Sequence, residues 1–274
     1  MPQPLQPFPS TADCLPESSL SLCLLASGSK GNAIYVSSGN TRILIDAGLS
    51  GAEMERRFRS RQILPQDLDA LVVTHEHSDH LQGVGVLARK YGIPVYISPA
   101  TYREAEKKMG RISGITHFSC GSGFCIQDIR LHPFSTAHDA SDPAGFTLQA
   151  NGKKIGIATD LGVATAMVRH HLSDCTCLVL EANHDQRMLE DGPYPWPIKQ
   201  RIKGRTGHLS NEAARDLLRC ICHHNLTHVI LGHISETNNR PDKALAVVSE
   251  GLLQNMAPRF TVALQHAPAP LIAL

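Results

Sequence analysis

The sequence has no apolar run of about 18 residues, so no membrane-spanning helix is expected. It also lacks an excess of either charge: 26 Lys and Arg stand against 25 Asp and Glu, a formal net charge of +1. This balance argues against a protein that coats nucleic acid by charge alone, but it leaves room for a local basic patch. There is no internal repeat.

The eight cysteines form no Cys-x-x-Cys pair. A chain of 274 residues buries on the order of 70–75% of its unfolded surface and needs no disulfides to be stable. We therefore expect buried free thiols and a reducing, cytoplasmic location. Five of the cysteines lie within apolar or helical-looking runs, namely Cys23, Cys175, Cys177, Cys220 and Cys222.

The first 19 residues contain five prolines before position 17. They lack the basic and then apolar build of a signal peptide, and their composition predicts a disordered leader. Residues 20–274 are then expected to form a single domain.

Strands and helices alternate along this predicted domain. Two successive blocks of strands followed by helices indicate an α+β fold of four layers, αββα, with two mixed sheets packed face to face and helices outside. Strands are expected at 20–26, 33–36, 41–45, 71–74, 94–98, 154–159, 176–180 and 229–231, with a strand-rich stretch at 115–150. Helices are expected at 51–61, 80–91, 99–109, 164–171, 211–223 and 241–254.

A dense polar segment follows the apolar run Leu71–Val73: it reads His-Glu-His-Ser-Asp-His, residues 75–80. Imidazole and carboxylate are the ligands that zinc, iron and manganese prefer. If His75 and His77 lie on an extended segment, both point to one face. Asp79 and His80 follow in the turn and can reach a second metal position. One loop can therefore supply the first ligands of two metal sites.

Further candidate ligands stand where strands end. Asp160 ends the apolar strand expected at 154–159, His233 follows the apolar run 229–232, and His138 lies within residues 135–140. One metal is assigned to His75, His77 and His138 and the other to Asp79, His80 and His233, with Asp160 bridging both. Two divalent ions that share a hydroxide would provide a nucleophile at neutral pH, because a metal lowers the pKa of bound water from about 15.7 to about 7.

These motifs, in this order, resemble those of the metallo-β-lactamase superfamily, over residues 20–262. The strings Ser27–Asn32, Leu180–Asp185 and Gly207–Asn211 resemble the YycJ-like branch, bacterial metallohydrolases described as DNA exonucleases. The resemblance implies the seven metal ligands above, a two-metal cofactor and the superfamily fold. It also implies that Asp46 orients the histidine loop.

Two departures argue against lactam hydrolysis. The third histidine lies in Thr136-Ala137-His138 rather than in the Thr-Pro-Gly-His string of lactamases, and Asp160 stands where the commonest lactamases have a cysteine. With two divalent ions at +4, and Asp79, Asp160 and a hydroxide at −3, the site keeps about +1. That charge suits an anionic phosphodiester.

Other residues are assigned by resemblance to ribonuclease Z relatives. His208 resembles their general acid and Glu181 its orienting partner; alternatively, each makes only local hydrogen bonds. His184 is a supporting or substrate-facing residue, or simply begins a helix. Lys30 is a phosphate contact or a solvated turn lysine.

A basic run beside Trp196 indicates a nucleic-acid track with a stacking residue, or a solvated segment. It comprises Lys199, Arg201, Lys203 and Arg205.

The leading hypothesis is a dinuclear metal-dependent phosphodiesterase, with zinc, manganese or iron, acting as an exonuclease on nucleic acid, most readily DNA. In this hypothesis, Asp79, Glu181 and His208 are the catalytic residues, and they act together with the bridging hydroxide. Two alternatives stay open: a small-molecule hydrolase of the cyclic phosphodiesterase or lactonase type, and ribonuclease Z-like RNA processing. The sequence leaves strand polarity and oligomeric state undetermined.

Overall fold

The computed structural model describes residues 19–252 and 257–274. All but the last residue of the expected leader therefore lies outside the described residues. The described chain forms two seven-stranded sheets. The first has the order β14 (Ile272–Ala273), β1 (Ser21–Ala26), β2 (Ala33–Ser38), β3 (Thr41–Ile45), β4 (Ala70–Val72), β5 (Val95–Ile97) and β6 (Ile115–His117). The second has the order β13 (Arg259–Val262), β12 (His228–Gly232), β11 (Cys177–Glu181), β10 (Lys153–Ala158), β9 (Ala144–Ala150), β8 (Ile129–Ser135) and β7 (Phe124–Ile126).

Each sheet changes from antiparallel to parallel pairing along the chain. In the first sheet β1, β2 and β3 pair antiparallel, whereas β3 to β6 pair parallel. In the second sheet β7 to β10 pair antiparallel, whereas β10 to β13 pair parallel. Parallel neighbours end at the same edge of a sheet. In the first sheet, the residues that follow β3 and β4 therefore lie at one edge. In the second sheet, the same holds for the residues that follow β10, β11 and β12.

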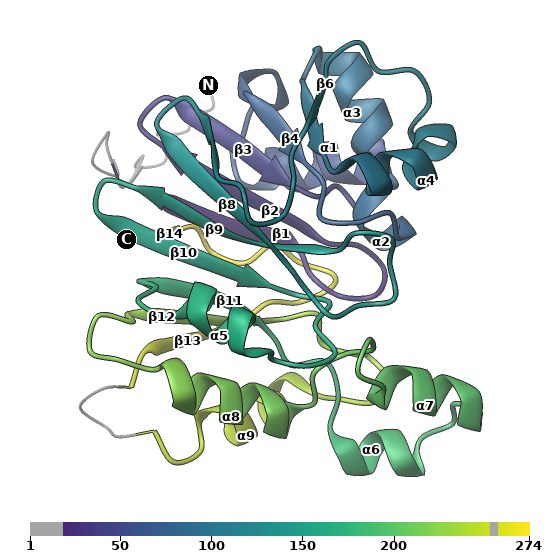
Figure 1. Ribbon diagram of the computed structural model, residues 1–274, viewed down its shortest axis with the longest axis vertical. Helices are drawn as coiled ribbons and strands as arrows, with labels where there is room; N and C mark the ends of the chain where they lie inside the picture. The colour runs from purple at the N-terminus through teal and green to yellow at the C-terminus, as the bar shows by residue number, and fades with distance from the viewer. Residues whose placement is uncertain (1–18, 253–256) are drawn as a thin grey trace, which may run out of the picture.

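Helices cover the outer face of each sheet, as Figure 1 shows. α1 (Gly51–Ser60), α3 (Val84–Tyr91) and α4 (Pro99–Met109) pack on the first sheet, and α5 (Ala166–Leu172), α8 (Asn211–Ile221) and α9 (Pro241–Ser249) on the second. Three further helices are α2 (Ser78–Leu81), which follows β4, and α6 (Gln186–Asp191) and α7 (Trp196–Lys203), which lie between β11 and α8; a 3₁₀ turn spans Pro65–Asp67. The predicted four-layer α+β sandwich is confirmed.

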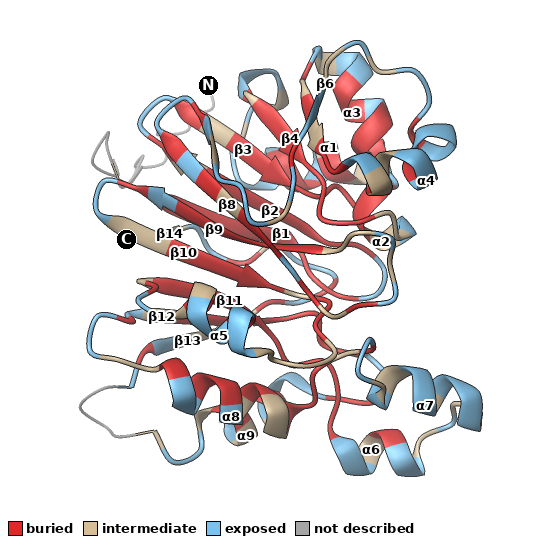
Figure 2. Cartoon of the chain, viewed as in Figure 1, coloured by how far each residue is buried: buried red, intermediate tan, exposed pale blue. Residues whose placement is uncertain are grey.

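The burial of β1 shows how the sequence specifies a middle layer. All six of its residues are buried, and successive side chains alternate between two cores. Leu22 and Leu24 join the core between the sheets, whereas Cys23 and Leu25 join the core under α1, α3 and α4. A strand that is covered on both faces is therefore apolar throughout rather than alternating. The central strands are buried, the edge strands β6, β7 and β13 are partly exposed, and the helices are exposed on one side, as Figure 2 shows.

Three predictions from the sequence need correction. The helix expected at 80–91 is two helices, α2 and α3, because Gly83 packs against the first sheet, with its N–H donating to the carbonyl of Ala47 at 2.7 Å. A Cβ at Gly83 would lie 2.5 Å from the carbonyl oxygen of Leu49. Helices α6 and α7 were not predicted. Helix α9 ends at Ser249, and positions 253–254 of its predicted range lie outside the described residues.

The cysteine prediction holds only in part. Cys23, Cys175 and Cys177 are buried free thiols, and burial raises the pKa of Cys23 to about 11. Cys220, however, is exposed and Cys222 half-buried, because they lie at the end of α8 beside the solvent. Within the described residues, no helix combines the length and apolar character needed to cross a bilayer.

Helix α1 is fixed to the first sheet by the buried side chain of Arg57. Its guanidinium donates to the carbonyls of Leu25 at 2.8 Å and Gln265 at 3.1 Å, and to the Glu53 carboxylate at 2.6 Å. Arg57 is 3% exposed. Glu53 therefore supplies the negative charge next to a buried cation, and Arg56 and Arg57 lower its pKa to about 2 although burial opposes this.

We predict that Glu53→Gln lowers the free energy of unfolding by about 1–2 kcal/mol, because a charge-assisted hydrogen bond to a buried cation is lost. Urea unfolding followed by circular dichroism measures the change. Glu55→Gln is the matched control, since Glu55 on the same helix forms its ion pair with the exposed Lys90 rather than with a buried cation. Equal unfolding midpoints for the two variants would contradict the role given to Glu53.

Candidate metal centre

Three strands end in residues with an unusual backbone, and all three carry candidate site side chains. Asp46 follows β3 with φ 60°, Asp160 follows β10 with φ 55°, and His233 follows β12 with φ 52°. Left-handed backbone is uncommon outside glycine, although Asp and His adopt it more readily than bulky residues, and such residues gather at functional sites. These three side chains therefore leave the edge of the sheets at which β3, β10 and β12 end.

The seven candidate ligands come together there in two groups. His75, His77 and His138 place ligand atoms within 4.8 Å of one another, and so do Asp79, His80 and His233. Asp160 lies between the groups. Its Oδ1 is 3.6 Å from His138 Nε2, and its Oδ2 is 3.1 Å from His80 Nε2.

Several of these ligand atoms are buried without a hydrogen-bond partner among the described residues: His75 Nε2, Asp160 Oδ2 and His233 Nε2. Buried polar atoms normally find a partner, and unpartnered nitrogens and oxygens that face one another suit the binding of a cation. The donors are imidazole nitrogen and carboxylate oxygen, which suit zinc, manganese and iron. The residues present therefore fit divalent metal binding.

The electrostatics of the cluster also favour positive charge. Burial opposes protonation of His80, but the carboxylates of Asp160 and Asp46 outweigh it and hold the His80 pKa well above the ordinary value. Burial likewise opposes a charge on Asp160, yet His233 and His80 hold the Asp160 pKa well below its usual range. At His75, burial prevails and lowers the pKa. The buried carboxylates thus create a strongly cation-attracting pocket.

Two further carboxylates fix the imidazoles from behind. Asp46 Oδ2 accepts hydrogen bonds from His80 Nδ1 at 2.7 Å and Thr74 Oγ1 at 2.8 Å, and its Oδ1 accepts from the Thr74 amide. Glu181 Oε1 lies 2.8 Å from Nδ1 of both His208 and His233. Each carboxylate engages Nδ1 and so leaves Nε2 of the ring to face the cluster, which is how metal-binding histidines are oriented.

Asn32 is a supporting residue that the sequence analysis missed. Its side-chain amide donates to Asp79 Oδ2 at 3.2 Å and lies 3.0 Å from His80 Nε2, and its oxygen accepts from the amide of Gly28. Its own backbone amide donates to the carbonyl of Asp79 at 2.7 Å. The Ser27–Asn32 turn, singled out only for its resemblance, therefore positions the start of α2.

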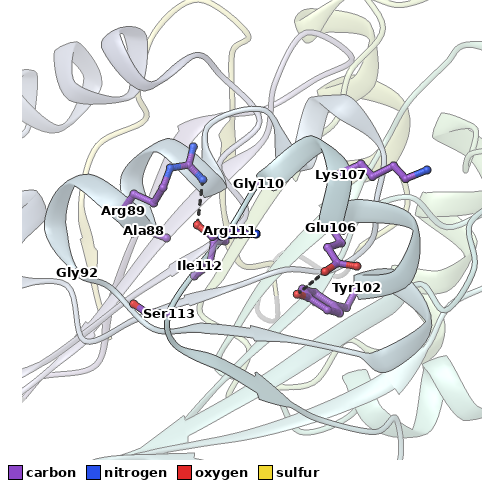
Figure 3. A pocket seen from close by; sticks show the side chains of 10 residues that line it. All are labelled: Ala88, Arg89, Gly92, Tyr102, Glu106, Lys107, Gly110, Arg111, Ile112 and Ser113. Atoms are coloured by element: carbon purple, nitrogen blue, oxygen red, sulfur yellow. Dashed lines mark hydrogen bonds between the residues drawn. The ribbon is translucent and has the colours of Figure 1, made fainter.

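A cavity of about 380 Å³ opens onto the cluster and is lined by His77, Asp79, His138, Asp160, His208 and His233, together with Tyr194, Ile198, Arg201 and Ile202. A larger hollow of about 740 Å³ lies between α3 and α4, as Figure 3 shows. Its polar groups are partly used in local contacts, such as Tyr102 to Glu106 at 3.3 Å and Arg89 to the carbonyl of Arg111 at 3.5 Å. Only the smaller cavity combines histidines with aspartates.

Two candidates lie away from the cavity. His184 is 2% exposed and does not line it, so it has no surface to offer a substrate, and burial lowers its pKa to about 4. Lys30 is exposed and pairs with Glu236 at 2.6 Å.

Three residues of the basic run, Lys199, Arg201 and Lys203, lie on helix α7, whereas Arg205 follows it. Lys203 pairs with Glu190 at 2.6 Å, and Lys199 donates to the carbonyl of the same residue. Trp196 is 71% exposed and does not line the cavity. Of the four cations, Arg201 alone lines it.

Comparison with known proteins identifies the family. The model of the beta-lactamase superfamily domain matches residues 41–234. The chain is 37% identical over 235 residues to the exodeoxyribonuclease YycJ of Bacillus anthracis, covering 85% of this chain and 89% of that one. The chain belongs to the β-lactamase superfamily, in its YycJ-like branch.

Two further matches agree with this. The exodeoxyribonuclease WalJ of Streptococcus pneumoniae is 36% identical, with 84% of this chain and 87% of that one covered. The crystal structure of YhfI from Bacillus subtilis, a metallo-β-lactamase fold protein, superposes with a TM-score of 0.70 at 14% identity, covering 92% of this chain and 99% of that one. The YhfI match, at this low identity, supports the fold alone.

Gly48 provides a test of how α2 is positioned in this YycJ-like chain. A Cβ at Gly48 would lie 1.6 Å from the carbonyl oxygen of Asp79 and 2.6 Å from the amide of Asn32. Gly48→Ala should therefore displace Asp79 and His80 and lower bound metal per chain by at least half, measured by elemental analysis. Gly114→Ala is the control, since its Cβ would meet only ordinary contacts of 3.4–3.5 Å with Pro94. Full metal content in Gly48→Ala would overturn the prediction.

Proposed function

We propose that this protein is a two-metal phosphodiesterase that removes nucleotides from the ends of DNA in the cytoplasm. The observation that carries the proposal is the position of Asp160 between two groups of three ligands, with His208 at the same cavity. The choice of DNA over RNA or a small diester is supported by the YycJ and WalJ relatives, which are named exodeoxyribonucleases.

In this proposal one ion is held by His75, His77 and His138 and the other by Asp79, His80 and His233, with Asp160 contacting both. Zinc, manganese and iron all accept such a donor set. When bound, the two ions would make a water-derived nucleophile available near neutral pH and offset the charge of the phosphate.

The protein's own acid in this proposal is His208. Its Nδ1 is engaged by the Glu181 carboxylate at 2.8 Å, which leaves Nε2 as the ring nitrogen for a substrate. The side chain is 19% exposed and lines the cavity, whereas Glu181 is fully buried. The carboxylate at Nδ1 fixes the orientation of the ring, so in this proposal Nε2 faces the substrate and donates the proton to the leaving oxygen.

Glu181 has no surface for substrate and acts through its neighbours. Its Oε2 accepts from the amides of Leu161 and Leu209, so its position is fixed from both sides. Burial raises the pKa of Glu181, but His208 and His233 bring it to about 2. It therefore stays ionised at every pH at which the enzyme would work and keeps both imidazoles oriented.

The substrate class is tested with protein stripped of metal and reconstituted separately with zinc, manganese or iron. The panel holds single- and double-stranded DNA and RNA labelled at defined ends, and bis(p-nitrophenyl) phosphate. We expect stepwise shortening of DNA from one end, abolished by chelator and restored by metal. Hydrolysis of RNA or of the small diester without any shortening of DNA would replace the proposed substrate with one of the alternatives.

His208→Ala should lower kcat for phosphodiester cleavage about 10²–10³-fold, the usual contribution of a positioned acid. Metal content should stay full, because His208 is not one of the seven proposed ligands. His170→Ala, which removes an exposed imidazole on α5, serves as the control. If His208→Ala retains kcat with both metals bound, another group supplies the proton.

A further inference from the structure

The segment between β11 and α8 contributes a wall to the metal cavity that the proposed chemistry does not use. It contains α6 and α7, which project beyond the sheets in Figure 1. None of the residues of α7 is buried. A helix that buries no side chain gains little stability from packing, so its apolar residues need another explanation.

One face of α7 is directed at the cavity. Ile198, Arg201 and Ile202, spaced i, i+3 and i+4, line it, and Tyr194 joins them from the preceding turn. This spacing places the three helical residues on one side of α7. Ile198 is 43% exposed although it lies at the cavity. The cavity therefore has an apolar and aromatic wall opposite a wall of histidines and aspartates.

Specific contacts hold this apolar wall against the metal ligands. Arg201 Nε donates to Asp139 Oδ2 at 2.5 Å, and Asp139 Oδ1 lies 3.4 Å from His138 Nε2. The Tyr194 hydroxyl donates to Thr237 Oγ1 at 3.3 Å, which orients the ring. A cation and an apolar surface are thus fixed side by side next to the place where a phosphodiester would be cut.

We propose that Tyr194 and Ile198 form the subsite for the base of the terminal nucleotide, and that the base enters it unpaired. The inference rests on the proposed nuclease function. A nucleotide has a flat apolar base and an anionic phosphate, and the cavity offers a surface for each. At about 380 Å³ it lies in the lower range of small-ligand sites, so it admits one nucleotide and leaves a pairing partner outside.

The subsite is tested with single-stranded DNA oligonucleotides whose terminal nucleotide either carries a base or is abasic, made separately for the 5′ and 3′ ends. At the end that is attacked, wild-type kcat/KM should fall about tenfold when the base is missing, as expected for lost base stacking. In Tyr194→Ser and Ile198→Ser this ratio should approach one, because the variants no longer distinguish the two substrates.

Trp196→Ser is the matched control. Trp196 is an exposed aromatic residue of the same helix that does not line the cavity, so its variant should keep the wild-type ratio. A blunt duplex should be cut more slowly than the same duplex with a mismatched terminal pair, since the terminal base must first leave its partner. Equal rates for the two duplexes would contradict entry of an unpaired base.

The outcomes separate the two proposals. Cleavage of DNA with an unchanged base-to-abasic ratio in both variants overturns the base subsite alone and leaves the exonuclease standing. No cleavage of any oligonucleotide by the wild type overturns both. The metal content of each variant is measured by elemental analysis. If Tyr194→Ser loses metal, the base-to-abasic ratio of Ile198→Ser decides whether the subsite exists, because Ile198 is partly exposed.

Discussion

The buried Glu181 carboxylate is the contact on which the rest of the site depends. One oxygen engages His208 and His233, and the other accepts from the amides of Leu161 and Leu209. Leu161 follows β10, His233 follows β12, and His208 and Leu209 precede α8, whereas Glu181 itself ends β11. A fully buried charge is tolerated only when hydrogen bonds and opposite charge satisfy it. The geometry that satisfies Glu181 is therefore the geometry that orients the imidazoles.

The first sheet repeats this arrangement with Asp46. That carboxylate binds Thr74 and His80, and so fixes the histidine loop much as Glu181 fixes the opposite side. Asp160 then lies close to a histidine of each group, His80 and His138. The two halves of the sandwich each contribute a carboxylate behind the ligands, which explains why the cluster lies at their common edge. Neither half holds the complete set of candidate ligands.

Selectivity and chemistry are carried by different parts of the molecule. The ligand cluster is built on strand ends inside the rigid sandwich, where small displacements are costly. The α6–α7 segment lies outside the sheets and contacts the cluster through Arg201 and Asp139. Such a segment can differ between relatives without disturbing the ligands, because it shares little of their packing. The general hydrolytic centre is thus combined with a local wall that suits a particular substrate.

The sequence by itself determined the four-layer fold, β3 and α4 to the residue, and the seven side chains that gather as candidate ligands. These follow from local patterns: apolar periodicity, proline and glycine positions, and an unusually dense run of histidines. Tertiary structure alone decided the break at Gly83, the role of Asn32 and the choice of Tyr194 rather than Trp196 at the cavity. Each depends on contacts between segments far apart in the chain, whose distances no local pattern contains. The sequence supplied the ligands, and the packing of two sheets decided what surrounds them.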